Sequence, residues 1–366
     1  MSIIAVGGDY GGAAALVPVI QALRARSQEA VRAIAYGQAT AVWSCAGLDF
    51  DTMGECTADA VDAVLAAAEA SVIVTGTSMN GVMLEQQFVR TARSRGLPSV
   101  AVLDAWINYR ERFVTADGTR CVPDRIAVVD ETARAEMVEA GFDPATLVIT
   151  GQPAFDDLPR WADEAAIQRA RELRRLWGVA PDARAVLFAS QPLIKLYGGR
   201  DDHAYFGYDE QTVLRLLISS LEEISRSASL PITLVIRPHP REDREPLQLA
   251  SAVITVLVNA DGHGRDAALA ADLVTGMTST LLQEACYLQR ITVSLQPGLR
   301  RPDVLQTNRL GHSQAVYDTE EVPEVLRRAL LDEDARSHWQ DRLRSLSVDG
   351  LASQRVIALL DNLRAF

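Results

Sequence analysis

Short apolar runs alternate with longer amphipathic stretches along the chain, and this alternation limits the folds that it can adopt. Apolar runs at 3–6, 31–36 and 71–75 are separated by stretches with helical periodicity at 13–26 and 57–68. A strand, a helix and a further strand in this order form the βαβ unit of a parallel sheet. The same alternation resumes in the second half of the chain. The sequence therefore predicts an α/β protein with doubly wound parallel sheets.

The length of the chain predicts two domains. Its 366 residues exceed the roughly 100 to 200 residues of a typical single domain. Residues 151–159 combine turn-forming glycine and prolines with apolar anchors, a composition typical of a crossing between domains. We predict a first domain at 1–155 and a second at 156–349.

Composition and charge exclude several classes of protein. Hydrophobic residues make up 48% and charged residues 23% of the chain, as in ordinary globular proteins. The formal net charge of -12 repels nucleic acid and anionic membranes unless a local basic patch dominates. No apolar run approaches the roughly 18 residues of a spanning helix, so we expect peripheral membrane contact at most. The first apolar run is too short for a secretion signal.

The cysteines predict a reduced environment and no metal site. Four cysteines are widely spaced, with no CxxC pair and no Cys/His cluster at the spacing of a zinc site. A cytoplasmic location is the simplest interpretation.

Two loops of small hydroxyl residues occupy equivalent places in the two halves. Residues 74–78 read Val-Thr-Gly-Thr-Ser and residues 274–279 read Val-Thr-Gly-Met-Thr-Ser, and each segment opens a helix with an early acid, Glu85 or Glu284. Unpaired backbone N–H groups at such a helix start bind anions. Ordinary helix capping by Ser and Thr explains either loop equally well.

The glycine-rich segment 7–12 follows the first predicted strand and precedes a helix. Gly11 and Gly12 would let the backbone approach a ligand closely, although they could simply form a tight turn. The segment is not a GxGxxG fingerprint, and the second strand ends in Gly37 and Gln38 rather than in an acid. A nicotinamide-dependent dehydrogenase is therefore a poor match.

The most specific motif is the run Arg237-Pro238-His239-Pro240-Arg241 after the strand at 232–236. Its prolines stiffen the loop, so that Arg237 and His239 could bind a diphosphate or His239 could act as an acid or base. The alternative is a surface loop with an idle histidine. Ser190 and Gln191, which end the strand at 185–189, are expected to face the same site.

In the first half, residues 103–113 concentrate acidic, basic and aromatic side chains directly after a strand. Loops in this position carry the chemistry of α/β enzymes. Asp104 is our preferred general base or acceptor-binding carboxylate, with Asp9 and Glu85 as rivals. A purely structural loop with Trp106 and Tyr109 in the core is an equally good interpretation.

Together these motifs resemble the GT-B superfamily, especially the branch of UDP-N-acetylglucosamine 2-epimerases and bacterial cell-surface polymer glycosyltransferases. The Arg237–Pro240 run resembles the basic-His loop of that superfamily. The segment 275–284 is similar to its Gly/Ser/Thr loop and glutamate, which grip diphosphate and ribose. The resemblance implies two Rossmann-like domains with a ligand cleft between them. It also implies a final helix, 350–366, that packs back on the first domain.

The resemblance implies a metal-independent glycosyltransferase that moves a sugar from a nucleotide-sugar donor, with UDP favoured, to an unidentified acceptor. A nucleotide-sugar 2-epimerase, hydrolysing or not, and a non-catalytic nucleotide-sugar-binding protein remain the alternatives. No cofactor beyond the nucleotide sugar is expected, and the oligomeric state stays open. The catalytic candidates are Asp104, Asp9, Glu85 and His239. The predicted nucleotide-sugar contacts are Gly11, Gly12, Ser190, Gln191, Arg237, His239, Gly276, Thr278, Ser279, Thr280 and Glu284.

Overall fold

The computed structural model describes residues 2–26, 30–115, 117–239, 242, 247 and 249–365. The chain divides into two units. Unit 1 comprises residues 1–157 and 348–366, and unit 2 comprises residues 158–347. The sequence predicted these boundaries between residues 155 and 156 and between residues 349 and 350.

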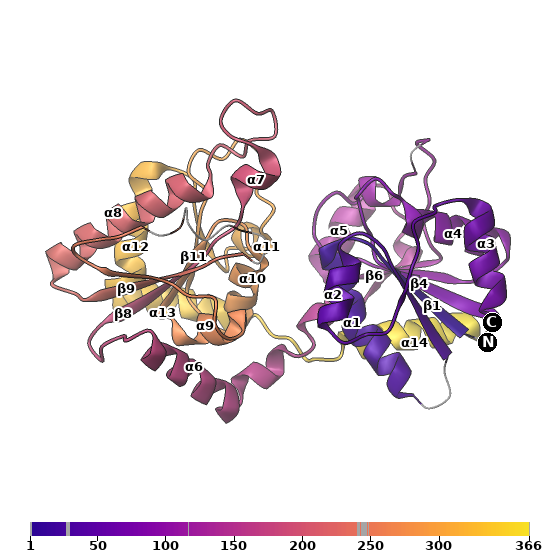
Figure 1. Cartoon of the computed structure of the whole chain (residues 1–366), viewed down its shortest axis with the longest axis horizontal. Helices are drawn as coiled ribbons and strands as arrows, with labels where there is room; N and C mark the ends of the chain where they lie inside the picture. Colours follow the sequence, from indigo (N-terminus) through magenta and orange to yellow (C-terminus); the bar gives the residue numbers. More distant parts are fainter. Residues whose placement is uncertain are drawn as a thin grey trace. The chain divides into compact units, whose positions relative to one another are not determined.

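Unit 1 contains a seven-stranded parallel sheet with helices on both faces (Figure 1). Its strands are β1 (Ser2–Gly7), β2 (Ala30–Ala35), β3 (Asp51–Thr52), β4 (Ala70–Thr75), β5 (Ser99–Val102), β6 (Arg125–Val128) and β7 (Leu147–Ile149). Its helices are α1 (Tyr10–Ala25), α2 (Ala39–Cys45), α3 (Ala58–Ala67), α4 (Leu84–Ser94), α5 (Glu131–Glu139) and α14 (Ala352–Arg364).

The strand order in unit 1 is β3-β2-β1-β4-β5-β6-β7. The order reverses between β1 and β4, which pair in parallel. Chain connections leave these two neighbours in opposite directions, and α/β proteins bind ligands at the carboxyl ends of the strands at such a reversal. Asp9 follows β1 and Thr77 follows β4.

The side chains of β1 point alternately to the two faces of the sheet, and both faces are covered. Ile3 and Ala5 pack in the core with α1 and α14, whereas Ile4 and Val6 pack in the core with α3 and α4. This alternation follows from the two-residue period of a strand. All four side chains have no exposed surface.

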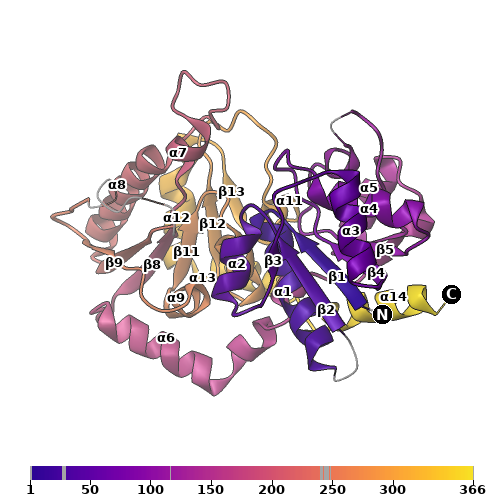
Figure 2. The ribbon, with the colours of Figure 1, turned by 45° about the vertical axis from the view of Figure 1, so that its right-hand side comes forward.

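The final helix, α14, belongs to unit 1 and lies against α1 in both views (Figure 2). Val356, Ile357 and Leu360 enter the core that α1 covers. The carboxylate of Asp156 accepts hydrogen bonds from the backbone N–H groups of Ala352 at 2.8 Å and Ser353 at 2.7 Å. An acid from the distant segment before unit 2 thus caps the start of this helix.

Unit 2 contains a six-stranded parallel sheet. Its strands are β8 (Arg184–Ala189), β9 (Ile232–Arg237), β10 (Thr255–Val258), β11 (Leu273–Gly276), β12 (Thr292–Leu295) and β13 (Gln314–Val316). Its helices are α6 (Glu164–Leu176), α7 (Leu193–Tyr197), α8 (Glu210–Ala228), α9 (Gly264–Ala270), α10 (Thr280–Tyr287), α11 (Gln306–Arg309), α12 (Val322–Leu331) and α13 (Glu333–Leu343).

The order in unit 2, β10-β9-β8-β11-β12-β13, repeats the arrangement of unit 1, with its reversal between β8 and β11. Val186 and Phe188 pack in the core with α8 and α12, whereas Leu187 packs on the opposite face with α6 and α9. Both sheets therefore confirm the predicted doubly wound α/β class.

Several element ends differ from the predicted ones. The first helix begins at Tyr10 rather than at residue 13, and β10 begins at Thr255 rather than at residue 252. The short α2, α7 and α9 were not predicted, because five to seven residues are too few to show helical periodicity. Within the described part of the chain, no helix has the length and apolar character needed to cross a bilayer.

Candidate functional site

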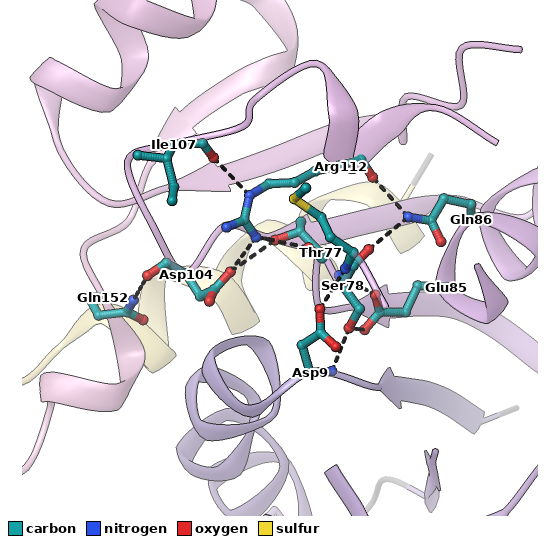
Figure 3. Close-up of polar contacts among 10 residues, drawn as sticks. Asp9, Thr77, Ser78, Glu85, Gln86, Asp104, Ile107, Arg112 and Gln152 are labelled. Atoms are coloured by element: carbon teal, nitrogen blue, oxygen red, sulfur yellow. Dashed lines mark hydrogen bonds and ion pairs between the residues drawn. The ribbon is translucent and has the colours of Figure 1, made fainter. Parts of the chain in front are cut away.

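In unit 1, the loops after β1 and β4 are joined at the reversal of strand order. The backbone N–H of Asp9 donates to Ser78 Oγ at 2.7 Å, and the backbone N–H of Met79 donates to Asp9 Oδ2 at 2.6 Å. Figure 3 shows these contacts. The predicted ligand loop after β4 is therefore held by an acid from the glycine-rich loop.

Glu85 lies beneath the loop that follows β4. It is the second residue of α4, is 2% exposed, and accepts from Ser78 N at 2.5 Å and Ser78 Oγ at 3.0 Å. Burial raises the pKa of the Glu85 carboxyl to about 8, against the lowering effect of the Ser78 hydrogen bonds and with a further raising effect from Asp9 and Asp104. Glu85 thus supports the loop, and its burial favours the protonated form of the carboxyl.

Replacing Glu85 by Gln is expected to flatten the pH dependence of stability. The carboxyl pKa is about 8 in the fold against an ordinary 4.5, so the folded state keeps a proton that the unfolded state has lost at intermediate pH. The free energy of unfolding of the wild type should therefore fall by on the order of 3 kcal/mol between about pH 5 and pH 8. The Gln side chain stays neutral and removes this fall.

Urea unfolding of wild type and Glu85→Gln at several pH values measures the effect. Glu139→Gln, at an exposed glutamate of α5, is the control and should behave as the wild type. Equal slopes of stability against pH in wild type and Glu85→Gln would show that Glu85 is ionised in the fold.

Asp104 is held by a buried arginine. Its Oδ1 accepts from Arg112 Nη1 at 2.8 Å and from Thr77 Oγ1 at 3.1 Å (Figure 3). Arg112 also donates to the carbonyl oxygens of Thr77 at 2.8 Å and Ile107 at 3.0 Å. The side chains of Arg112 and Asp104 are 9% and 14% exposed. This network fixes the orientation of the Asp104 carboxylate.

The glycines of segment 7–12 make room for this carboxylate. A Cβ atom on Gly11 would lie 1.9 Å from Asp104 Oδ2, and one on Gly12 would lie 3.3 Å from the Cα of Gly76. Packing against Asp104 and against the loop after β4 thus accounts for both glycines. Their contact with a nucleotide sugar stays a prediction.

Two carboxylate oxygens of this cluster remain available. Among the residues that the structure describes, Asp104 Oδ2 and Asp9 Oδ1 accept no hydrogen bond. Asp9, Glu85 and Asp104, which were selected from the sequence by position alone, come together in unit 1. We name these three acids with Arg112 the carboxylate cluster.

In unit 2, Gln191 and Thr278 meet at the corresponding reversal. Gln191 Oε1 accepts from the backbone N–H of Thr278 at 2.8 Å and from Thr278 Oγ1 at 3.3 Å. Gly276 lets this segment pack closely, because a Cβ there would lie 2.8 Å from the carbonyl oxygen of Ala189. Both units therefore join the loops that follow their two central strands.

Ser279 caps α10, with its Oγ accepting from the backbone N–H of Leu281 at 3.3 Å. Within the described part of the chain, no acceptor is found for the backbone N–H groups of Ser279 and Thr280. Unpaired N–H groups at the start of a helix favour an anion. The capping and the anion-binding interpretations are therefore compatible at this loop.

Ser190 and His239 are brought together by Glu242. Ser190 Oγ donates to Glu242 Oε1 at 2.7 Å, and the backbone N–H of His239 donates to Glu242 Oε2 at 2.9 Å. The remaining residues of the predicted motif, Pro240 and Arg241, lie outside the described residues. Glu242 therefore fixes the loop that carries His239.

Arg237 is directed at the segment before α9. Its Nη1 donates to the carbonyl oxygen of Asp261 at 3.0 Å and its Nη2 to that of Gly262 at 2.8 Å. Burial lowers the pKa of the Arg237 guanidinium below its ordinary value, and this effect outweighs the raising effect of the charges on Asp261 and Asp266. Within the described part of the chain, two of its five N–H groups thus donate to backbone carbonyl oxygens.

Glu284 pairs with a residue that the sequence pattern did not indicate. Its Oε1 accepts from Arg265 Nη2 at 2.9 Å, and the two side chains are 20% and 6% exposed. Glu284 is thus held from α9, whereas Glu85 folds back onto its own loop. The two acids that follow the repeated loops therefore differ in their contacts.

Comparison with solved structures defines the fold. UDP-GlcNAc 2-epimerase from Neisseria meningitidis, bound to UDP-GlcNAc, matches with a TM-score of 0.66 at 13% identity, covering 99% of this chain and 100% of that one. UDP-GlcNAc 2-epimerase from Methanocaldococcus jannaschii matches with a TM-score of 0.67 at 15% identity over the same shares. MurG from Acinetobacter baumannii gives 0.63 and 12%, again over 99% and 100%.

The chain has the GT-B fold. The resemblance inferred from the sequence is thus confirmed for the fold. No protein-family model and no curated protein matches its sequence.

Sequence analysis missed the residues that support the side chains of the candidate site. Arg112 lies eight residues after Asp104, and Gln152 donates through Nε2 to the carbonyl oxygen of Asp104 at 2.8 Å from 48 residues away. Glu242 and Arg265 act in the same way on His239 and Glu284. No short motif links these pairs. The only signal of a supporting role in the sequence was the charge of Arg112, Glu242 and Arg265, which lie at the ends of strands and helices.

Proposed function

We propose that this GT-B protein acts on a UDP-linked sugar and inverts a carbon of that sugar. The similar Neisseria and Methanocaldococcus proteins are named for this type of reaction. The observation that carries the proposal is the carboxylate cluster. It combines an ion-paired acid, Asp104, with a buried acid, Glu85, whose pKa is raised to about 8 by burial. Two carboxyl groups in contrasting environments are typical of acid–base catalysis.

The carboxylate cluster would move the protons. Inversion at carbon 2 requires that its C–H bond breaks and forms again on the other face. Asp104 Oδ2 takes the proton, the C–H electrons form a double bond to carbon 1, and UDP leaves carbon 1 with the electrons of the C–O bond. Return of a proton and of UDP completes the inversion. We assign the return of the proton to Asp9, which is partly exposed and can take up a proton from solvent.

Unit 2 would bind the nucleotide. The backbone N–H groups of Ser279 and Thr280, the hydroxyl of Thr278 and the remaining N–H groups of Arg237 offset the charge of the leaving diphosphate. Glu284 would accept from the ribose through Oε2. The proposal assigns no step to a metal ion or a further cofactor, so turnover should persist in excess EDTA.

Sugar transfer to an acceptor is the second candidate. The TM-score of 0.63 to MurG equals or exceeds the TM-scores to two of the epimerase structures, 0.62 and 0.63, and this supports the second candidate. The carboxylate cluster would then deprotonate the acceptor. The two candidates differ in their need for a second substrate.

Incubation with UDP-N-acetylglucosamine alone, followed by chromatography, tests the proposal. An epimer of the substrate or released UDP supports inversion, whereas turnover that requires an added acceptor supports transfer. A thermal-shift panel of UDP, GDP, CDP and TDP tests the nucleotide site separately, because a ligand of the folded state raises its melting temperature. A shift without any turnover would indicate a binding protein.

A further inference from the structure

Three large apolar side chains are exposed in the chain segments that also carry Asp9 and Ser78. Tyr10 is 58% exposed, Met79 is 43% exposed and Val82 is 43% exposed. Tyr10 is the first residue of α1, directly after Asp9, and Met79 and Val82 lie in the segment between β4 and α4 that also carries Ser78. Large apolar residues on an otherwise polar rim mark a binding surface when they gather at one place.

Hydrogen bonds bring these apolar residues to the acids. Asp9 accepts from Met79 N at 2.6 Å and directly precedes Tyr10. Gly11, the next residue, approaches Asp104 so closely that a Cβ atom would lie 1.9 Å from Oδ2. Tyr10 is therefore the chain neighbour of both Asp9 and Gly11, and the backbone of Met79 is hydrogen-bonded to Asp9.

The chemistry of this surface selects its ligand. The carboxylates of Asp9 and Asp104 repel phosphate groups and accept hydrogen bonds from hydroxyls. An aliphatic chain would remove these carboxylates from water without giving them hydrogen-bond donors, and this desolvation is unfavourable. A pyranose ring offers both hydroxyl donors and an apolar C–H face for the ring of Tyr10.

We infer that Tyr10 and Met79 form the subsite for the sugar ring of the nucleotide sugar, with Tyr10 as the platform beneath the ring. The inference rests on the proposed function and deepens it. Tyr10 and Met79 add an apolar contact for the sugar ring to the hydroxyl-accepting carboxylates of Asp9 and Asp104 in unit 1.

Isothermal titration with UDP and with UDP-N-acetylglucosamine separates the two moieties. Tyr10→Ala should weaken binding of the nucleotide sugar about tenfold and leave the Kd of UDP unchanged, because only the sugar loses an aromatic contact. Tyr10→Phe keeps the ring and should bind both ligands as the wild type does. Leu176→Ala, at a 61% exposed leucine of α6, is the control and should change neither Kd.

Each outcome decides the assignment. Equal affinity of wild type and Tyr10→Ala for the nucleotide sugar overturns the platform, and so does an equal loss for UDP and the nucleotide sugar. A wild-type protein that turns over the nucleotide sugar while Tyr10→Ala binds it unchanged would leave the proposed function intact and remove only this subsite. A wild type that binds neither ligand would remove both.

Discussion

Replacement of Asp104 by Asn should lower kcat on a nucleotide sugar about a thousandfold. Asn keeps an oxygen that can accept from Arg112 and Thr77, so the geometry around Oδ1 survives. It removes the basic oxygen at the Oδ2 position, which accepts no hydrogen bond within the described part of the chain. General acid–base groups typically contribute about a hundredfold to ten-thousandfold.

Steady-state turnover measures this loss, and titration with UDP shows whether binding survives. The Kd of UDP should stay at its wild-type value, because the nucleotide is assigned to unit 2. Asp51→Asn, at an exposed acid of β3 that pairs with Arg32, is the matched control and should keep full activity. A fall in kcat below tenfold for Asp104→Asn would give the role of base to another residue.

Replacement of Arg112 by Met should destabilise unit 1 by about 3 to 5 kcal/mol. Arg112 is buried and donates to Asp104, to Thr77 and to the carbonyl oxygen of Ile107. Removal of one partner of a buried ion pair leaves an uncompensated charge and unpaired acceptors. The variant should also lose activity, because Asp104 loses the contact that orients it.

Urea unfolding monitored by circular dichroism measures the change. Arg110→Met, at an exposed arginine that donates to one carbonyl oxygen, should cost less than about 1 kcal/mol. The double variant Asp104→Asn, Arg112→Met should lose less stability than the sum of the single changes, because it buries no unpaired charge. A loss of less than about 1 kcal/mol for Arg112→Met would show that the pair is not effectively buried.

The sequence predicted those parts of the fold that depend on local periodicity. The apolar runs at 3–6 and 71–75 became the central strands β1 and β4, because buried parallel strands read as continuous apolar segments. Elements of a few residues, such as β3 and α9, had no such pattern. Their formation depends on contacts with the rest of the sheet.

The candidate site was predictable where it follows strands and unpredictable where it depends on tertiary contacts. Asp9 and Asp104 were chosen because the carboxyl ends of parallel strands meet at one edge of a sheet. The burial of Glu85 could not be read from its place at the start of a helix. The contact between Gly11 and Asp104 joins residues 93 positions apart, so no local pattern contains it.

Incubation with UDP-N-acetylglucosamine in D2O, without any acceptor, tests the central claim most directly. Inversion by the carboxylate cluster replaces the hydrogen at carbon 2 with deuterium from the solvent, and proton NMR detects the loss of that signal. We predict deuterium at carbon 2 with wild type and Asp51→Asn, and none with Asp104→Asn. Retention of the carbon 2 proton by wild type, with turnover only after an acceptor is added, would contradict the proposed inversion and establish transfer.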